Sequence, residues 1–246
     1  NRKGADFIKQ YDIDFSFSKP YELIEHFIKI SNKSNNIKIL DFFAGSGTTL
    51  HSVLNLNKQD NGSRECIIIT NNENNICDNV TYPRIKRIIE GYTNQKDKVM
   101  PSFPENNLFV YKTDTLNSEP SLMNKRKVTK NATDLICIKE NCYWEVNHDL
   151  GFTQNQAQIF TNNNGKYLVA IYHSRNQLEI QKKLLEWIQN LENVTEMVKI
   201  YAFSPEKEVL VEEFKEVSDK VDVVPLPEFI YNTYLTTIKN LDLNNN

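Results

Sequence analysis

The sequence predicts an α/β fold in two parts, a partial doubly wound parallel sheet over residues 1–116 and a smaller α+β domain over residues 117–246. Hydrophobic patterns in the first part follow a β-α-β-α-β order, which is typical of parallel strands joined by right-handed crossovers. The pattern changes after a polar, basic stretch, and no fourth or fifth parallel strand with its helix follows in the same style. The first sheet is therefore expected to be only half of a doubly wound sheet.

The first part is expected to begin with the end of a helix or a loop at residues 4–10, a short strand at 15–18 and a helix at 21–30. Strands are then predicted at 37–42, 66–70 and 108–112, with helices from 46–48 to about 56 and over 80–92 between them. The run Cys66 to Thr70 is continuously apolar and β-branched, as in a strand buried on both faces.

The second part begins with residues 117–131, which are interpreted as a linker or an exposed helical turn. Two apolar runs then flank Asn162 to Gly165, which is a hairpin signal. The predicted elements are a hairpin of 157–161 and 166–172, a helix at 177–191, strands at 197–203 and 221–224, and a helix at 231–241.

Composition excludes several function classes. The net charge of −3 gives no overall basic character, so contact with nucleic acid has to rest on local patches. The four cysteines form no C-x-x-C pair and the four histidines have no ligand spacing, so we expect free thiols in a reducing cytosol and no metal. No signal peptide is visible, and no apolar run approaches the roughly 18 residues that span a bilayer, so a cytoplasmic location is expected.

The most informative motif is the run from Ile37 to Thr49, which predicts a buried strand, an acidic residue, a glycine turn and a helix start. Gly45 and Gly47 let the backbone approach a ligand where a Cβ would clash. The first amides of the following helix can hold a carboxylate. Asp41 can order the glycine loop or accept from a ligand's ammonium group. This arrangement suits an adenosine-bearing cofactor, and Phe-x-Gly-x-Gly favours S-adenosylmethionine (SAM) over a dinucleotide.

A second polar group, Asn71 to Asn74, follows the second predicted strand. A carboxylate such as Glu73 at this place can accept hydrogen bonds from both ribose hydroxyls. The alternative is a generic strand-turn-helix whose glycines serve only packing. A lone G-x-G deserves that interpretation, whereas the full run with an acid past the second strand favours cofactor binding.

These residues resemble the β-class amino-methyltransferases of DNA, and most closely the modification subunits of type III restriction systems. Residues 17–24 are similar to motif X of that family, 41–49 to motif I, 67–76 to its second strand with the ribose acid, 81–88 to the helix that follows, and 111–114 to motif III. The resemblance is dense over residues 4–116 and implies a partial Rossmann-like SAM-dependent methyltransferase sheet. The residues that it marks for SAM binding are Lys19, Pro20, Asp41, Phe42, Phe43, Ala44, Gly45, Ser46, Gly47, Thr48, Thr49, Glu73 and Asn74.

The resemblance implies methylation of adenine N6 in double-stranded DNA, with the target base flipped out of the stack. It also implies a homodimer that works with a restriction subunit. The family's Asp-Pro-Pro-Tyr motif, which orients the amine and stacks on the base, is not found in this sequence, which has no Pro-Pro pair. Motif X directly before motif I marks the permuted order, in which the catalytic motif precedes motif X. The chain is therefore expected to be the C-terminal portion of the enzyme and inactive alone, with no catalytic residue of its own.

Two other functions remain open. Residues 117–246 could form an assembly module for dimerisation or for contact with the restriction subunit, or the parent enzyme could methylate a substrate other than DNA. Among the basic residues, Arg84, Lys86 and Arg87 are expected to form the solvated face of their helix rather than a phosphate site. The cluster Lys125 to Lys130 is either a contact with a DNA backbone or a flexible basic linker.

Overall fold

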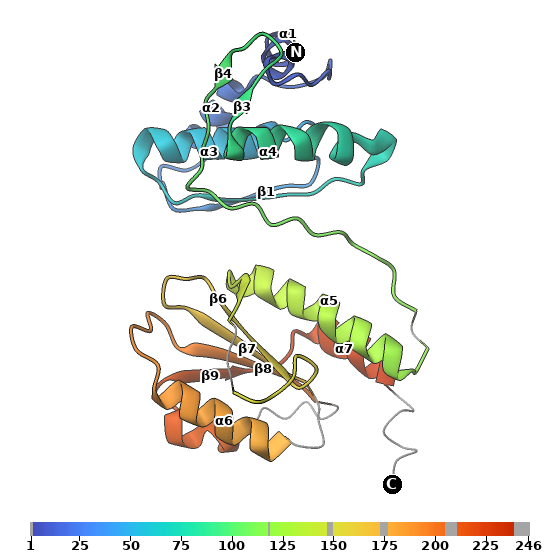
Figure 1. Ribbon diagram of the computed structural model, residues 1–246, viewed down its shortest axis with the longest axis vertical. Coiled ribbons are helices and arrows are strands. Elements are labelled where there is room, and N and C mark those ends of the chain that lie inside the picture. Colours follow the sequence, from blue (N-terminus) through green and yellow to red (C-terminus); the bar gives the residue numbers. More distant parts are fainter. Residues whose placement is uncertain (1, 118, 147–149, 173–176, 205–210, 239–246) are drawn as a thin grey trace. The chain divides into compact units, whose positions relative to one another are not determined.

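The computed structural model describes residues 2–117, 119–146, 150–172, 177–204 and 211–238 (Figure 1). The chain divides into two compact units, Asn1–Val110 and Tyr111–Asn246. The boundary predicted from the sequence, between residues 116 and 117, lies six residues later. The C-terminal unit, expected to be the smaller, is the longer of the two.

The N-terminal unit is built around two short parallel strands and the helix that joins them. Its elements are α1 (Arg2–Ile8), α2 (Tyr21–Ser31), β1 (Lys38–Asp41), α3 (Thr48–Asp60), β2 (Glu65–Ile68), α4 (Tyr82–Glu90), β3 (Tyr92–Thr93) and β4 (Val99–Met100). β1 and β2 pair in parallel with Asp41 opposite Ile68, so both strands end at the same edge. The predicted β-α-β-α order up to residue 90 is confirmed.

Helices cover only one face of the β1–β2 pair, as Figure 1 shows. Ile39 and Cys66 pack toward the cores formed with α2 and α3. On the opposite face Leu40 is 49% exposed and Ile69 is 46% exposed. Parallel sheets normally have both faces covered, so this pair presents an open apolar face within its unit.

Two predicted strands of this unit are wrong. Residues 16 and 17 form a turn. Ser18 is buried in a polar cluster and Phe17 points into solvent, so the alternation over 15–18 does not correspond to two faces of a strand. Residues 108–112 are not assigned to a strand and have no strand partner among the described residues. High β-propensity forms no strand without a neighbour to pair with. A short antiparallel hairpin, β3–β4, precedes them instead.

The C-terminal unit contains a mixed five-stranded sheet of order β5-β6-β7-β8-β9. Its elements are α5 (Leu122–Glu140), β5 (Trp144–Glu145), β6 (Ala157–Thr161), β7 (Tyr167–Tyr172), α6 (Gln177–Gln189), β8 (Val198–Phe203), β9 (Val221–Val224) and α7 (Glu228–Ile238). β5, β6 and β7 pair antiparallel, and β7, β8 and β9 pair in parallel. The hairpin at Asn162–Gly165 and the predicted strands at 197–203 and 221–224 are confirmed.

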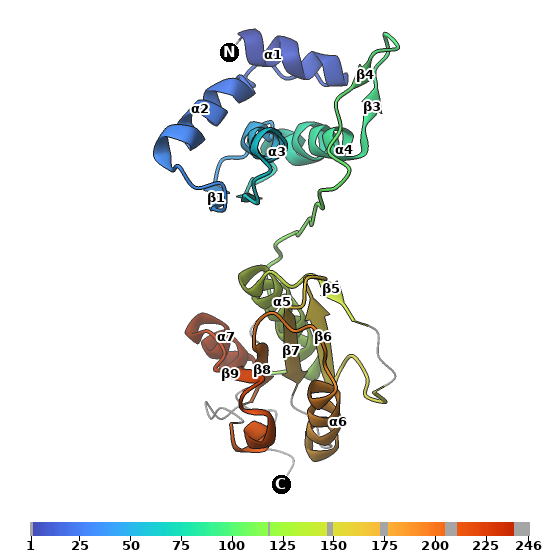
Figure 2. The same ribbon diagram turned by 90° about the vertical axis from the view of Figure 1, so that its left-hand side faces the viewer.

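This unit has helices on both faces of its sheet (Figure 2). α5 and α7 pack on one face around Tyr172, Tyr201 and Phe203, while α6 packs on the other around Val169 and Ile200. The sheet combines an antiparallel meander of β5 to β7 with two parallel pairs, and α6 connects two of the parallel strands in the manner of an α/β unit.

The expected linker at residues 117–131 is also wrong over most of its length. α5 begins at Leu122, its first turn is capped by Ser121 Oγ, which accepts from Asn124 N at 3.1 Å, and Val128 is buried against the sheet. The prediction gave weight to the basic side chains and overlooked an apolar stripe at helical spacing, which continues through Ile136. α7 starts three residues earlier than predicted, and residues 239–241 of that predicted helix lie outside the described residues.

No helix in the described ranges is long and apolar enough to cross a membrane.

Candidate cofactor site

The glycine loop connects β1 to α3 at the carboxyl edge of the two parallel strands. Ala44 N donates to Ile69 O at 3.0 Å, and Ile69 N donates to Asp41 O at 2.8 Å, so the loop continues the pairing of the strands. Gly47 N donates to Ala44 O at 2.7 Å and closes the turn directly before Thr48, where α3 begins. The sequence-predicted order of strand, acid, turn and helix is present.

The two glycines serve different needs. Both have left-handed backbone conformations, with φ of 51° at Gly45 and 75° at Gly47. A Cβ on Gly47 would lie 3.1 Å from Ile85 Cδ1, so this glycine permits close packing of α4. A Cβ on Gly45 would meet only Phe43 O, at 3.7 Å, so its open side leaves room for a ligand. Packing alone accounts for Gly47 but not for Gly45.

Asp41 holds the loop through both carboxylate oxygens. Oδ1 accepts from Phe43 N at 2.9 Å, and Oδ2 accepts from Thr49 Oγ1 at 2.6 Å across the loop. Of the two roles considered for Asp41, the structure shows the ordering of the loop. Phe42 and Phe43 are exposed beside it, Phe43 at 91%, and therefore offer apolar surface to a ligand.

The loop after β2 places the predicted ribose acid on the surface. Asn72 organises this loop: its Oδ1 accepts from Cys77 N at 2.9 Å, and its Nδ2 donates to Asp78 Oδ2 at 2.8 Å. Glu73 and Asn74 are exposed. A carboxylate presented in this way beyond β2, near the edge that carries the glycine loop, fits the chemistry of a diol-binding group.

The Lys19–Pro20 segment lies against the glycine loop through its backbone. Thr48 Oγ1 donates to Lys19 O at 3.5 Å, and Ser18 Oγ lies 2.9 Å from Ser46 Oγ. A Cβ on Gly4 would be 2.2 Å from Ser18 O, so α1 touches the same segment from the other side. The structure thus brings the predicted motif X and motif I residues together.

Sequence reasoning missed the residue that joins these segments, Arg84. Its side chain is fully buried, so the expected solvated face is wrong for this position. Arg87 is also engaged: it donates to Asp12 O at 3.3 Å, and its guanidinium lies 4.5 Å from the centre of the Tyr92 ring. Of the three basic residues only Lys86 extends into solvent, 4.0 Å from Glu90. A usable signal existed, since Arg84 lies four residues before buried Ile88 and hence on the apolar face.

Arg84 and His51 form a buried polar pair beneath the loop. Arg84 Nη1 donates to Ser46 Oγ at 3.0 Å and to Thr48 Oγ1 at 3.0 Å, while Nη2 lies 3.2 Å from His51 Nδ1. Burial, and to a lesser extent the neighbouring guanidinium charge, lower the pKa of His51 to about 3, so the imidazole is neutral and accepts through Nδ1. Burial also lowers the pKa of Arg84 to about 10, which leaves it charged at neutral pH.

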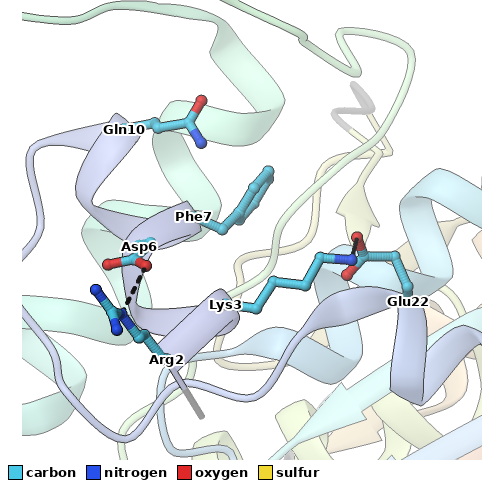
Figure 3. Close-up of a pocket in the computed structure, with 6 residues that line it drawn as sticks. All are labelled: Arg2, Lys3, Asp6, Phe7, Gln10 and Glu22. Carbon is cyan, nitrogen blue, oxygen red and sulfur yellow. Dashed lines mark ion pairs between the residues drawn. The ribbon is translucent and has the colours of Figure 1, made fainter.

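A separate depression of about 450 Å³ lies between α1 and α2 (Figure 3). Its charged rim is paired within the chain, with Arg2 Nε 3.9 Å from Asp6 Oδ2 and Lys3 Nζ 2.8 Å from Glu22 Oε1. It contains none of the predicted cofactor residues, so we assign it no part in the site.

The motif III candidate, residues 111–114, belongs to the C-terminal unit. Asp114 Oδ1 accepts from the backbone N of the next residue, Thr115, at 2.8 Å. Trp187 on α6 packs against Tyr167 with ring centres 5.6 Å apart and lies, partly buried, against the core of the C-terminal unit.

Comparison with known proteins gives matches to part of the chain. Residues 8–82 match the model of a DNA methylase family. A 56-residue segment, 23% of the chain, is 45% identical to the Mod subunit of the type III restriction-modification enzyme StyLTI of Salmonella typhimurium and covers 8% of that protein. A 59-residue segment, 24% of the chain, is 46% identical to the Mod subunit of EcoPI of Escherichia phage P1 and covers 9% of it.

The chain thus matches less than a tenth of the length of these two relatives. Over that segment the resemblance to type III modification subunits is confirmed, and the matched family segment includes the glycine loop and the residues from Lys19 to Glu73.

Proposed function

We propose that this chain is the SAM-binding and C-terminal portion of a DNA adenine-N6 methyltransferase of a type III restriction-modification system. The observation that carries the proposal is the glycine loop held by Asp41 at the carboxyl edge of β1 and β2, with the Lys19–Pro20 segment bound to it and Glu73 exposed beyond β2. The family match over residues 8–82 supports the reaction class.

Each part of the site has a distinct role in this proposal. The first amides of α3 lack intrahelical partners and bind the methionine carboxylate. The Glu73 carboxylate accepts hydrogen bonds from the ribose hydroxyls, and Phe43 packs on the cofactor. Bound SAM supplies an activated methyl group. The residues of this chain bind and orient the cofactor, and none of them abstracts a proton.

The open face of the β1–β2 pair supports the idea of a partial catalytic domain. Leu40 and Ile69 are both more than 40% exposed there, although parallel strands are usually buried on both faces. We propose that helices of the rest of a Rossmann-like methyltransferase domain cover this face in the complete enzyme. The 246 residues contain no Asp-Pro-Pro-Tyr, so the chain alone is proposed to be inactive in methyl transfer.

Calorimetry with SAM tests the cofactor assignment. The unaltered chain is expected to bind SAM, and Glu73→Ala is expected to bind it at least about tenfold more weakly, because charge-assisted hydrogen bonds to the ribose are lost. Glu105→Ala removes an exposed carboxylate elsewhere in the same unit and is the matched control. Absence of SAM binding, or an unchanged affinity in Glu73→Ala, would contradict the assignment.

A transfer assay tests the second part of the proposal. The chain is incubated with labelled SAM and duplex DNA that contains adenine, and no transfer is expected. Methylated DNA from residues 1–246 by themselves would show that the catalytic group lies within the chain after all.

A role in assembly is a second candidate function for the C-terminal unit. The unit exposes large apolar side chains on α5 and α7, with Met123 68% exposed and Phe229 74% exposed. Exposed apolar surface is typical of sites where proteins contact one another. It therefore favours a homodimer or binding of the restriction subunit, and we propose that this assembly acts on DNA in the cytoplasm. Light scattering on the whole chain tests this: a dimer that Phe229→Ser weakens is expected, and a strict monomer that binds no restriction subunit would count against it.

A further inference from the structure

Arg84 is a buried cation without a carboxylate partner. Its side chain has no exposed surface, and none of the described carboxylates forms an ion pair with it. Moving a charge out of water costs several kcal/mol unless an opposite charge lies close by. Arg84 is instead surrounded by hydroxyl and carbonyl oxygens and a neutral imidazole, which solvate the charge without cancelling it.

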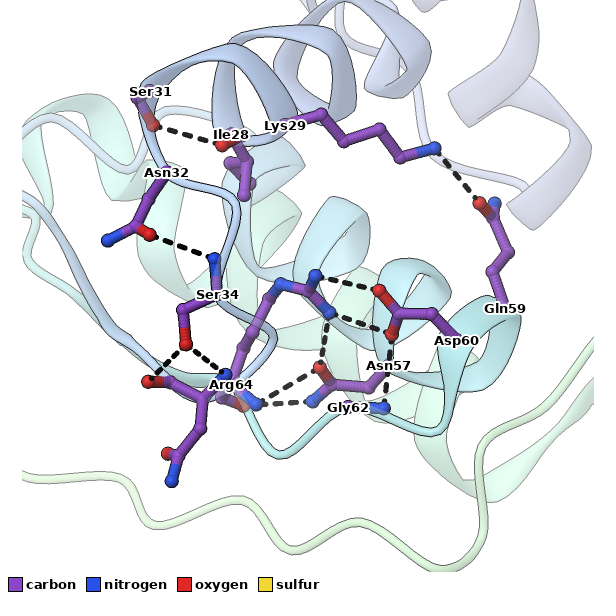
Figure 4. A network of polar contacts seen from close by, with 11 residues as sticks. Ile28, Lys29, Ser31, Asn32, Ser34, Asn57, Gln59, Asp60, Gly62 and Arg64 are labelled. Carbon is purple, nitrogen blue, oxygen red and sulfur yellow. Dashed lines mark hydrogen bonds and ion pairs between the residues drawn. The ribbon is translucent and has the colours of Figure 1, made fainter.

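Arg64 shows how the same unit treats another largely buried guanidinium. Arg64 donates to both carboxylate oxygens of Asp60, at 2.9 Å and 2.7 Å, and to Asn57 Oδ1 at 3.3 Å (Figure 4). This network lies at the C-terminal end of α3, at the opposite end of the helix from the glycine loop. Arg64 is neutralised inside the chain, whereas Arg84 is not.

The groups around Arg84 give no compensating negative charge at neutral pH. His51 remains uncharged because burial holds its pKa near 3. Burial raises the pKa of the Tyr11 hydroxyl to about 12, so the phenol also remains neutral. The cluster therefore carries one net positive charge. Among the described residues Arg84 Nε, like Arg64 Nε, has no hydrogen-bond partner.

The cluster lies directly at the start of α3. Arg84 Nη1 reaches Ser46 O at 3.1 Å, Ser46 Oγ at 3.0 Å and Thr48 Oγ1 at 3.0 Å, on either side of Gly47, which precedes the helix. The helix end adds roughly half a positive charge. The buried cation and the helix end therefore favour an anion at the same place.

Arg84 also connects the two segments of the proposed site. Ser18 Oγ accepts from Nη1 at 3.3 Å and lies 2.9 Å from Ser46 Oγ. Ser18 and Thr48 hydroxyls both reach Lys19 O, at 3.4 Å and 3.5 Å. The guanidinium thus fixes the backbone of the Lys19–Pro20 segment against the glycine loop.

We infer that Arg84 is a positioning residue whose buried charge, transmitted through the hydroxyls of Ser18, Ser46 and Thr48, makes this site select a cofactor that carries a carboxylate. The inference rests on the proposed function and names what the site recognises at the amino-acid end of the ligand. Arg84 does not touch the ligand in this scheme, and the first amides of α3 make the direct contact.

The test compares SAM with decarboxylated SAM, which differs only by the missing carboxylate. Arg84→Met removes the charge at similar length and is expected to weaken SAM binding about tenfold, the size of one partly buried charge interaction, while decarboxylated SAM changes less than about twofold. Arg84→Lys keeps the charge and loses the planar fork, so it retains most of the preference for SAM. Arg64→Met is the control for general destabilisation, because it removes an ion pair far from the glycine loop. This variant is expected to keep the preference for SAM over decarboxylated SAM.

A structural role alone would weaken both ligands equally, and that outcome would overturn the inference. Ser46→Ala removes one transmitting hydroxyl and is expected to reduce the preference in the same direction, which keeps the inference testable if Arg84→Met fails to fold. A chain that binds SAM with the same preference in Arg84→Met and Ser46→Ala contradicts only this inference. An unaltered chain that binds neither ligand contradicts the proposed function, and the inference with it.

Discussion

His51 is expected to make the stability of the N-terminal unit depend on pH. The imidazole is 4% exposed, and its ring lies 5.4 Å from Phe7 and 5.1 Å from Tyr21, measured between ring centres. Nδ1 faces Arg84 Nη2, so protonation would bury a second positive charge beside the first. Burial, followed by the charge of Arg84, lowers the pKa of His51 from 6.5 to about 3.

The sign follows from the direction of this change. The folded-state pKa lies below the unfolded value, so the unfolded state binds a proton first as the pH falls. The contribution of His51 is fully present above pH 6.5 and decreases as the pH falls toward 3. Between pH 7 and pH 5 the linkage relation gives a loss of about 2 kcal/mol in the free energy of unfolding of this unit.

Hydrogen exchange followed by mass spectrometry measures this loss at peptides from α3 and α4, after correction for the intrinsic exchange rate at each pH. His51→Gln keeps an acceptor for Arg84 but cannot be protonated, so about 2 kcal/mol of the loss between pH 7 and pH 5 should disappear. His26→Gln removes an exposed histidine on α2 and should retain it. An equal pH dependence in His51→Gln and the unaltered chain would refute the reasoning.

Three further substitutions or reactions have defined outcomes. Gly4→Ala should displace α1 and destabilise the N-terminal unit by about 1–3 kcal/mol in the same exchange experiment, because its Cβ would lie 2.2 Å from backbone Ser18 O; an unchanged exchange rate in α1 would contradict this. Gly165→Ala, with φ of 82° and a Cβ 2.4 Å from Asn193 O, should destabilise the C-terminal unit by at least about 1 kcal/mol in urea titrations read by the fluorescence of its two tryptophans, without changing SAM affinity. Iodoacetamide at pH 8 should alkylate Cys77 before the other three cysteines, since burial raises its pKa but leaves its thiol the least buried of the four; an equal rate at all four would count against the described packing.

The sequence predicts the elements whose pattern is set by their own residues. β1, α3, β2 and α4 follow from runs of β-branched residues and from helical spacing, and the β6–β7 hairpin follows from its Asn-Gly turn. Residues 108–112 have the same kind of pattern and yet form no strand. An apolar run forms a strand only if a neighbouring strand has a free edge with which it can pair. The local sequence pattern does not show whether such an edge exists.

Charge misleads for a related reason. Lys125, Arg126 and Lys127 suggested a linker, but a helix needs only one apolar stripe, and Val128 and Ile136 supply it. Arg126 and Lys127 are exposed, while the Lys125 ammonium lies 5.7 Å from the centre of the Tyr234 ring. In α4 the reverse holds, because a basic residue, Arg84, occupies the apolar stripe itself. Position on the helical face decides burial in both cases, and residue type decides only what burial then costs.

The candidate site divides in the same way. The glycines, Asp41 and Glu73 can be predicted from the sequence because only a few residue types suit a ligand-binding loop. Gly45 has open space on its outer side, and Asp41 has two carboxylate oxygens that accept from two donors of the loop. Arg84 is required for a different reason. It donates hydrogen bonds to four acceptors that lie 36 to 66 residues away in the sequence. The place of Arg84 on the apolar face of α4 indicates its burial, but its hydrogen-bond partners are set by the folded arrangement and not by its neighbours in the chain. Under the proposed function, a buried guanidinium that the fold leaves without a carboxylate adds to the loop motif a prediction about the ligand, namely that the group bound next to it carries a negative charge.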